Sequence, residues 1–189
     1  MFQTLNIPAG RKVLFPNLYK QIDEALTKRT SFAYLFKGDV GTGKSELMNI
    51  IASCFSNDRM LFSSTTEIYE DYLSISQSDF SDKGEALKRR EYAFKRPYIF
   101  IDDLGIETTR YAKANAYIEA GIYKMYDAWK RHRRFCYIIT TNMGLPGRPS
   151  IQEVYGARVE DRIIEMFTIV EFKHKSFRQN NRKIHKEVR

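Results

Sequence analysis

Apolar residues along the chain fall into short runs of strand type that alternate with longer stretches of helical spacing. Five runs have the length and composition of strands, at 33–36, 60–64, 98–103, 135–142 and 168–172. Apolar positions three and four residues apart predict helices at about 17–30, 46–55, 65–73, 85–95, 110–131 and 156–166. Because strands and helices alternate, the sequence predicts an α/β fold in which helices cover both faces of a parallel sheet.

Capping and turn residues set the expected ends of several elements. Asn17 is the expected N-cap of the first helix, and Thr65 or Thr66 is that of the helix after the second strand. Pro97 ends the basic helix before the third strand. Polar and turn-forming residues predict irregular structure over 1–16, 74–84 and 146–149.

A glycine-rich motif, Gly-Asp-Val-Gly-Thr-Gly-Lys-Ser at 38–45, lies between the first strand and the next helix. This is the context of a phosphate loop, whose backbone N–H groups and helix N-terminus attract phosphate oxygens. Lys44 would reach the β- and γ-phosphates and Ser45 would hold Mg²⁺. The flanking strand and helix disfavour the alternative, a glycine turn with an accidental lysine. The expected nucleotide-binding residues are Gly38, Val40, Gly41, Thr42, Gly43, Lys44, Ser45 and Glu46.

Two carboxylates follow the apolar run at 98–101, at the edge of the sheet where parallel strands place their sites. Asp102 is the candidate Mg²⁺ ligand, and Asp103 is placed to polarise the attacking water. The alternative is a pair of aspartates that cap the next helix. Two buried carboxylates without a cation would be costly, which favours the metal interpretation.

Two other polar features complete the candidate catalytic site. The strand at 135–142 ends in Thr-Thr-Asn, and Asn142 would either orient water beside the γ-phosphate or form the turn before Gly144. Arg158 and Arg162 share one face of the following helix. An arginine at a domain edge can stabilise γ-phosphate charge on a neighbouring subunit, whereas a solvated pair beside acidic residues is the ordinary alternative.

Composition narrows the class of protein. The chain has 189 residues, 43% of them hydrophobic and 29% charged, as in a soluble domain with a full core. No apolar run has the length of a membrane span and the first residues lack a signal-peptide pattern, so we expect a cytoplasmic protein without membrane contact. Cys54 and Cys136 lie in apolar stretches and are expected to be buried free thiols, not metal ligands.

The formal net charge of +8 favours a polyanionic partner, although a solvated basic surface with a disordered tail is the plain alternative. Between the second and third strands, cations occur among tyrosines. Cations can follow a nucleic acid backbone while aromatic rings stack on its bases. The alternative is that the tyrosines pack in the core and the cations lie on a solvent-exposed helix face. The candidate DNA-binding residues are Lys88, Arg89, Arg90 and Lys95.

The chain resembles the AAA+ ATPases of the DnaC/DnaI helicase-loader and IstB transposition-helper group over roughly residues 30–180. Ser-Phe-Arg at 176–178 also looks like the Ser-Tyr-Arg ending of this group. The resemblance implies a P-loop NTPase sheet of five parallel strands in the order 5-1-4-3-2, without a full C-terminal helical lid. The motifs that carry it are 38–45, Ile-Asp-Asp-Leu-Gly at 101–105, Thr-Thr-Asn at 140–142 and Gly-x-Arg-x-x-x-Arg at 156–162.

The resemblance also implies ATP or ADP with Mg²⁺ at a subunit interface, and roles for single residues. A replicative helicase, single-stranded DNA and a second copy of the chain are the implied partners. Asp103 stands where these ATPases usually carry glutamate, which leaves the hydrolysis rate open. The implied roles are Mg²⁺ binding at Asp102, water activation at Asp103, sensor 1 at Asn142, the arginine finger at Arg158 and a sensor-2-like nucleotide contact at Arg178.

Three segments are expected: an N-terminal segment with a helix at 1–30, the ATPase domain at 31–175 and a basic tail at 176–189. Helicase loaders usually carry a separate helicase-binding domain, and only about thirty residues precede this core. Two other functions stay open. One is an IstB-like helper that binds duplex DNA and a transposase, and the other is a nucleotide-gated adaptor with little turnover.

Overall fold

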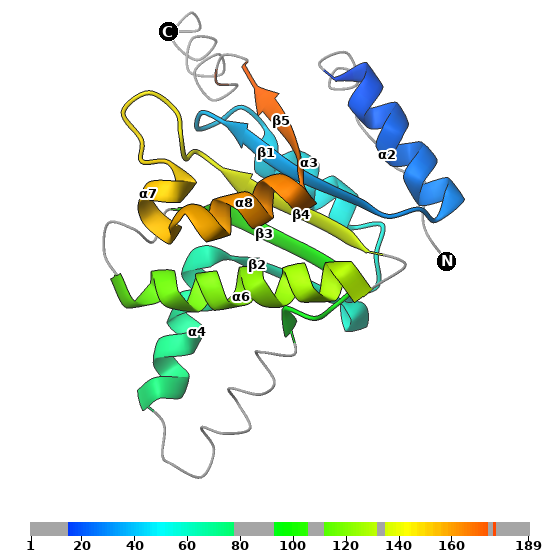
Figure 1. The fold of residues 1–189 in the computed structure, drawn as a ribbon. Helices are drawn as coiled ribbons and strands as arrows, with labels where there is room; N and C mark the ends of the chain where they lie inside the picture. Colours follow the sequence, from blue (N-terminus) through cyan, green and yellow to red (C-terminus); the bar gives the residue numbers. More distant parts are fainter. Residues whose placement is uncertain (1–14, 78–92, 106–111, 132–134, 174–175, 177–189) are drawn as a thin grey trace, which may run out of the picture.

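The computed structural model describes residues 15–77, 93–105, 112–131, 135–173 and 176. Within this part of the chain, five strands form one sheet in the order β2-β3-β4-β1-β5, with every neighbouring pair parallel (Figure 1). This sheet confirms the predicted fold class and strand order. The strands are β1 (Phe32–Gly38), β2 (Met60–Ser64), β3 (Tyr98–Leu104), β4 (Cys136–Thr141) and β5 (Thr168–Phe172).

Helices cover both faces of the sheet and give the domain three layers (Figure 1). One face carries α2 (Pro16–Lys28) and α3 (Lys44–Ala52). The other face carries α4 (Thr65–Gln77), α6 (Ala112–Arg131), α7 (Ile151–Tyr155) and α8 (Ala157–Met166). A 3₁₀ turn, η1 (Asn57–Arg59), leads into β2. Among the described residues no helix follows β5, in line with the expected lack of a full lid.

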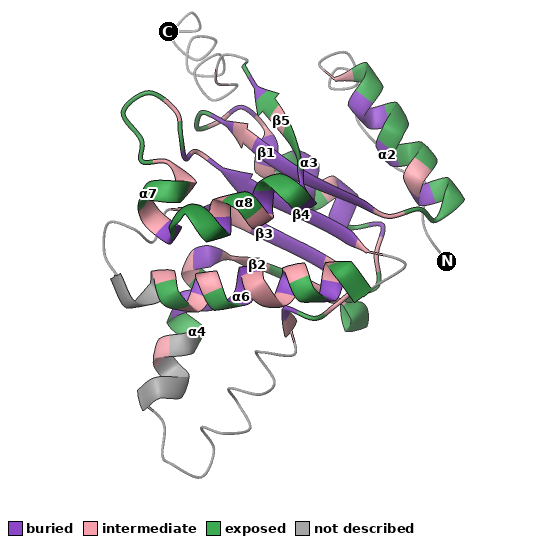
Figure 2. Ribbon diagram, viewed as in Figure 1, coloured by how far each residue is buried: buried purple, intermediate pink, exposed green. Residues whose placement is uncertain are grey.

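Side chains of the central strands alternate between the two layers of the core. On β1, Phe32, Tyr34 and Phe36 pack with α2 and α3, whereas Ala33 and Leu35 pack with the helices of the other face. Full burial of a large apolar side chain contributes about 1.5–3 kcal/mol, so this double burial fixes the register of the strand. Figure 2 shows the central strands buried and the outer faces of the helices exposed.

The two edge strands are far less buried than the central ones. Phe62 on β2 is 46% exposed and Ile169 on β5 is 47% exposed. On β3, by contrast, Ile99, Phe100 and Ile101 are at most 1% exposed. The continuous apolar run at 98–101 therefore belongs to a strand covered on both faces, as the sequence predicts.

The beginning of α2 differs from the prediction. The helix starts at Pro16 with Phe15 as its N-cap residue and no side-chain cap, so the prediction of Asn17 as the N-cap is wrong. The reason is the fixed φ of proline and its missing N–H, which suit the first helical position.

Reciprocal caps start two other helices. The Ser64 Oγ accepts from the Glu67 N–H at 3.1 Å, and the Glu67 carboxylate accepts from the Ser64 N–H at 2.8 Å. Ser64 thus caps α4 in place of Thr65 or Thr66, and α4 extends to Gln77 into the stretch predicted to be turn-like. The same motif at Ser150 and Glu153 starts α7, a short helix that the sequence analysis missed.

Cys54 and Cys136 are buried and free, which confirms that part of the prediction. Burial raises the pKa of both thiols, which keeps them protonated. Among the described helices, none combines the length and the apolar character needed to cross a membrane. The predicted helix at 85–95 lies almost entirely outside the described residues, as does the predicted tail at 176–189.

Candidate nucleotide-binding site

The loop at 38–45 connects the carboxyl end of β1 to the N-terminus of α3. Gly41 and Gly43 have positive φ angles of 79° and 91°, a backbone conformation open to glycine at little cost. The Thr42 Oγ1 donates to the carbonyl O of Asp39 at 2.8 Å, and this bond closes the loop on itself. The loop therefore leads with a defined shape into the N-terminus of α3, as phosphate binding requires.

Lys44 lies inside this loop with only 4% of its surface exposed. Its Nζ donates to the carbonyl O of Gly38 at 2.9 Å, to that of Asp39 at 2.8 Å and to the Oδ1 of Asn142 at 2.9 Å. The ammonium thus joins the phosphate loop to the end of β4, although the two residues are 98 positions apart. Buried charge is tolerated only when it is hydrogen-bonded, and these three acceptors satisfy it.

Ser45 and Asp102 are the second link between the loop and the sheet. The Ser45 Oγ donates to the Asp102 Oδ1 at 2.8 Å, and the Thr140 Oγ1 donates to the same carboxylate oxygen. A hydroxyl beside a carboxylate offers the hard oxygen ligands that Mg²⁺ takes in phosphate-loop sites, where the nucleotide and water supply the rest. The residues at this place therefore fit the expected metal.

The strand β3 is irregular where it carries the carboxylates. Its register against β4 shifts between Ile101 and Leu104, and Asp103 has a φ of 57°. Consecutive side chains of a regular strand point to opposite faces, so a bulge is needed to re-aim one of them. A left-handed φ in a residue other than glycine is costly and persists only where the surroundings impose it.

Three buried threonines impose this conformation. The Asp103 N–H donates to the Thr140 Oγ1 at 2.9 Å, and the Thr65 Oγ1 donates to the Asp103 carbonyl O at 2.8 Å. The Thr141 Oγ1 donates to the Leu104 carbonyl O at 2.7 Å. All three hydroxyls belong to fully buried residues. The sequence analysis gave Thr65 only as a possible helix cap, and it recognised the Thr-Thr-Asn motif without assigning the two threonines a role.

The glycine of the Ile-Asp-Asp-Leu-Gly motif has a steric reason. Gly105 has a φ of 100°, and a Cβ at this position would lie 2.4 Å from the Sδ of Met143. Met143 directly follows Asn142, so its side chain packs beside the residue that ends the carboxylate motif. The positive φ strains any other residue here, and a Cβ would also require the Met143 side chain to move.

The arginines of the box at 156–162 lie on α8, away from these bonds. Arg158 is exposed in the first turn of α8. Among the described residues, no hydrogen bond or ion pair joins its side chain to the loop at 38–45. Arg162 is partly buried against the tyrosines of α6. Lys44, Ser45, Asp102 and Asn142 are thus brought together in one chain, and Arg158 is not.

Other predicted residues give a mixed picture. Lys95 is described and exposed. Lys88, Arg89, Arg90 and Arg178 lie outside the described residues. Their expected contacts with DNA and with nucleotide therefore stay predictions.

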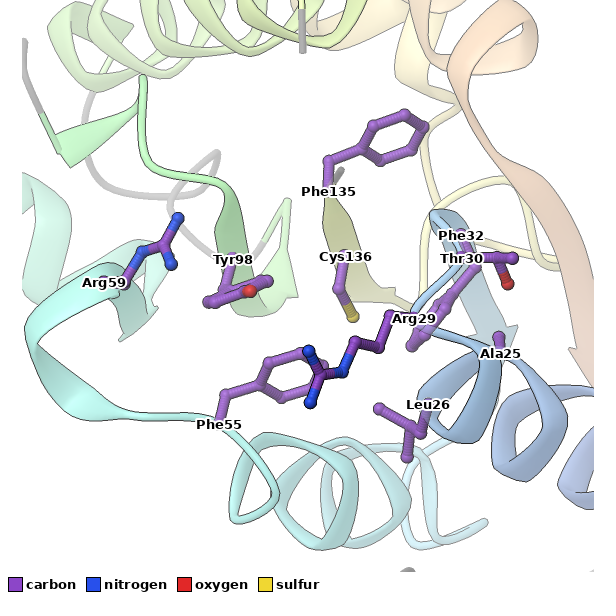
Figure 3. Close-up of a pocket in the computed structure, with 10 residues that line it drawn as sticks. All are labelled: Ala25, Leu26, Arg29, Thr30, Phe32, Phe55, Arg59, Tyr98, Phe135 and Cys136. Atoms are coloured by element: carbon purple, nitrogen blue, oxygen red, sulfur yellow. The ribbon is translucent and has the colours of Figure 1, made fainter. Parts of the chain in front are cut away.

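Two hollows differ in their relation to the site. One of about 450 Å³ lies beside the phosphate loop, with walls that include Gly38, Asp39 and Arg148. Its volume is in the range of small-molecule sites. The other, about 240 Å³, lies where β1, β3 and β4 begin, and Phe55, Tyr98 and Arg29 are among its walls (Figure 3). None of the predicted site residues lines this second hollow, which places it apart from the nucleotide chemistry.

Comparisons with known proteins agree with this geometry. The family model of ATPases associated with various cellular activities (AAA) matches residues 34–168. No curated protein matches the sequence.

Among solved structures, DnaA of Aquifex aeolicus bound to AMPPCP has a TM-score of 0.60 at 15% identity, over 98% of this chain and 55% of that chain. The replication initiator DnaA bound to AMPPCP and single-stranded DNA has a TM-score of 0.61 at 15% identity, over 92% and 52%. The DnaC helicase loader has a TM-score of 0.57 at 19% identity, over 85% and 91%. The chain spans about half the length of the two DnaA structures. At these identities the likeness shows the fold alone.

Proposed function

The chain belongs to the AAA family of ATPases, and from this membership we propose that it binds and hydrolyses ATP as a DnaC-like loader of a replicative helicase. In this role it would act in the initiation of DNA replication and contact single-stranded DNA. Nucleotide would bind along residues 38–45, with Glu46 and Arg178 as further contacts.

The observation that carries the proposal is the pair of bonds between the phosphate loop and the strand ends. The Lys44 Nζ meets the Asn142 Oδ1 at 2.9 Å, and the Ser45 Oγ meets the Asp102 Oδ1 at 2.8 Å. Phosphoryl transfer depends mainly on positioning and on charge stabilisation. A preformed cluster of ammonium, hydroxyl, carboxylate and amide supplies both.

Ser45 and Asp102 would hold Mg²⁺, which neutralises charge on the phosphates when it is bound. Lys44 would exchange the carbonyl oxygens of Gly38 and Asp39 for phosphate oxygens. That exchange would also release the Asn142 amide, which could then orient the attacking water. Asp103 would accept or polarise the proton of this water from the bulge that the threonines hold.

Arg158 would complete the site from a neighbouring copy of the chain. It is exposed, and among the described residues no hydrogen bond or ion pair joins it to its own phosphate loop, as expected of an arginine that acts in a second subunit. Such an arginine stabilises the charge that develops on the transferred phosphoryl group. The proposal therefore includes self-association through the ATP site.

The choice of a helicase loader over other AAA ATPases rests on the motifs at 101–105 and 156–162 and on the likeness to DnaC, which spans 91% of that chain. The DnaA neighbour was solved with single-stranded DNA, which agrees with the basic segment that contains Lys88, Arg89 and Arg90. The formal net charge of +8 also suits a polyanion.

Steady-state ATP hydrolysis with and without single-stranded DNA tests the enzymatic part. We expect turnover that Asp103→Ala abolishes while ATP binding persists. Absence of any turnover in the wild-type protein would contradict the enzyme and support the nucleotide-gated adaptor, which the aspartate at 103 motivates. Parallel capture on a purified replicative helicase and on a transposase separates the loader from an IstB-like helper, and retention by the transposase alone would overturn the loader.

A further inference from the structure

The two arginines of the box at 156–162 have different surroundings. Arg158 is exposed, whereas Arg162 one turn later packs on α6. The Arg162 guanidinium carbon lies 4.2 Å from the centroid of the Tyr123 ring and 5.1 Å from that of the Tyr126 ring. A guanidinium within about 6 Å of an aromatic face is attracted by the ring quadrupole. Arg162 is therefore engaged within its own chain.

Arg162 also bonds to the backbone of the turn that carries Arg158. Its Nη1 donates to the Arg158 carbonyl O at 3.1 Å. The planar guanidinium can stack with its face and donate from its edge at the same time, which the compact ammonium of lysine cannot do. The Arg162 side chain thus links the tyrosines of α6 to the first turn of α8.

The first turn of α8 has no side-chain cap. Its N-cap residue is Gly156, which has a φ of 87° and provides no side-chain cap. The apolar residues Val159 and Ile163 are fully buried and anchor α8 to the core. They fix the helix on its buried side, and Arg162 contacts α6 from the face of the helix that it shares with Arg158.

The ring of Tyr126 is itself held in place. Its hydroxyl donates to the Glu165 carboxylate on α8. The Lys130 Nζ lies 4.4 Å from the centroid of the same ring and 3.6 Å from the Glu165 carboxylate. These contacts hold the Tyr126 ring in place, and its stack with Arg162 is one of several contacts between α6 and α8.

We propose that Arg162 is a positioning residue that holds the first turn of α8 so that Arg158 can reach ATP bound by a neighbouring copy. The inference rests on the proposed function, because it takes Arg158 to act across a subunit interface. A positioning role predicts an asymmetry between the two subunits that a purely structural role does not. Arg162 should matter in the subunit that donates Arg158 and not in the subunit that holds the ATP.

Mixed assemblies test this asymmetry. A Lys44→Ala chain can donate Arg158 but binds no nucleotide, and an Arg158→Ala chain binds ATP but donates nothing. We expect each chain alone to be inactive and an equimolar mixture to recover hydrolysis. Arg162→Lys is then placed in one of the two chains at a time. In the donor it should lower the recovered kcat by about tenfold with little change in KM, because the stack and the carbonyl bond are lost. In the acceptor it should leave the recovered rate unchanged.

The outcomes separate the two claims. Equal loss with Arg162→Lys in donor and acceptor, or no loss in either, overturns the positioning role while the recovered hydrolysis leaves the arginine across the interface intact. Absence of recovery in the mixture without the Arg162 change overturns the proposed function itself. Binding of a fluorescent ATP analogue and the melting temperature of each variant identify chains that have failed to fold.

Ring variants give a second, independent readout. Tyr123→Phe in the chain that supplies Arg158 keeps the aromatic face, so the recovered rate of hydrolysis should equal that with the wild-type tyrosine. Tyr123→Leu in the same chain should lower the recovered rate. When combined with Arg162→Lys, Tyr123→Leu should add little, since both remove the same stack. If Tyr123→Leu and Arg162→Lys lowered the recovered rate additively, the two residues would not act through one shared stack.

Discussion

The nucleotide site and the arginine box are built on different principles. Around Lys44 and Asp102, buried polar groups are joined by short hydrogen bonds between elements far apart in the sequence. Around Arg158, an exposed side chain stands on α8, which Val159 and Ile163 anchor to the core and whose Arg162 stacks on the tyrosines of α6. In the proposed function, one half of the chemistry would be preformed in the chain and the other half would be presented at the surface.

This difference separates binding from turnover. The side chains expected to contact the metal and the phosphates all belong to one chain. A monomer should therefore bind ATP. Hydrolysis would then depend on whether a second copy brings Arg158. The four predictions that follow probe the two halves in turn, from the largest expected effect to the smallest.

Lys44→Ala should abolish measurable ATP binding, because it removes the only ammonium that the described residues place inside the loop at 38–45. Titration with a fluorescent ATP analogue measures this. Lys28→Ala is the matched control, since Lys28 is exposed and paired with Glu24 at 3.3 Å. Normal ATP binding by Lys44→Ala would show that the phosphate-loop assignment is wrong.

Arg158→Ala should leave ATP affinity unchanged and lower kcat in the assembled form by about a thousandfold or more, as arginine fingers do. The control is Arg131→Ala, which removes an exposed arginine at the end of α6. Steady-state hydrolysis at a protein concentration that saturates turnover provides the measurement. Unchanged turnover would remove Arg158 from the reaction and leave it a surface residue.

Thr140→Val keeps the shape of the side chain but leaves the Asp103 N–H without its acceptor and the Asp102 carboxylate without one of its donors. We expect a loss of about 1–3 kcal/mol in the free energy of unfolding, the usual result of an unsatisfied buried donor. We also expect a lower kcat, because the bulge that aims Asp103 loosens. Urea unfolding and hydrolysis are the measurements, with the exposed Thr168→Val as control. Wild-type stability and turnover in Thr140→Val would refute the supporting role of Thr140.

The smallest effect is expected from Glu67→Gln, on the free energy of unfolding. Hydrogen bonds from the Ser64 N–H and from the hydroxyls of Ser63 and Ser64 lower the pKa of Glu67 in the folded state. A lowered folded-state pKa stabilises the protein above the unfolded value, about 4.3, and this stabilisation disappears as the pH falls through the folded value. Glu67→Gln should therefore be less stable than wild type at pH 7, and the gap should narrow as the pH falls toward 3. A gap independent of pH would contradict the cap.

Local patterns allowed most of the fold and the phosphate loop to be predicted. The run at 98–101 and the glycines at 38–45 carry their structure within a few residues, and the sheet order follows the family that they resemble. The N-cap predictions failed at Asn17 and Thr65 because neighbouring residues, Pro16 and Ser64, compete for the same helix start. Such competition is decided by one or two contacts.

The supporting part of the site could not be predicted in the same way. Thr65 and Thr140 hold Asp103 from 38 and 37 positions away, so their role depends on the pairing of strands and not on local sequence. The difference between Arg158 and Arg162 is likewise invisible in the box itself, since it comes from the tyrosines of α6. Hydroxyls and arginines of this kind look like ordinary polar residues until the fold places their partners.

The dependence of turnover on protein concentration tests the central claim most directly. ATP binding and steady-state hydrolysis are measured in the same dilution series of the wild-type chain. The account predicts a constant affinity for ATP and a rate per chain that rises with concentration and then saturates, as copies assemble and share Arg158. A rate per chain that is the same at every concentration, in a protein that stays monomeric, would contradict a site completed by a second subunit.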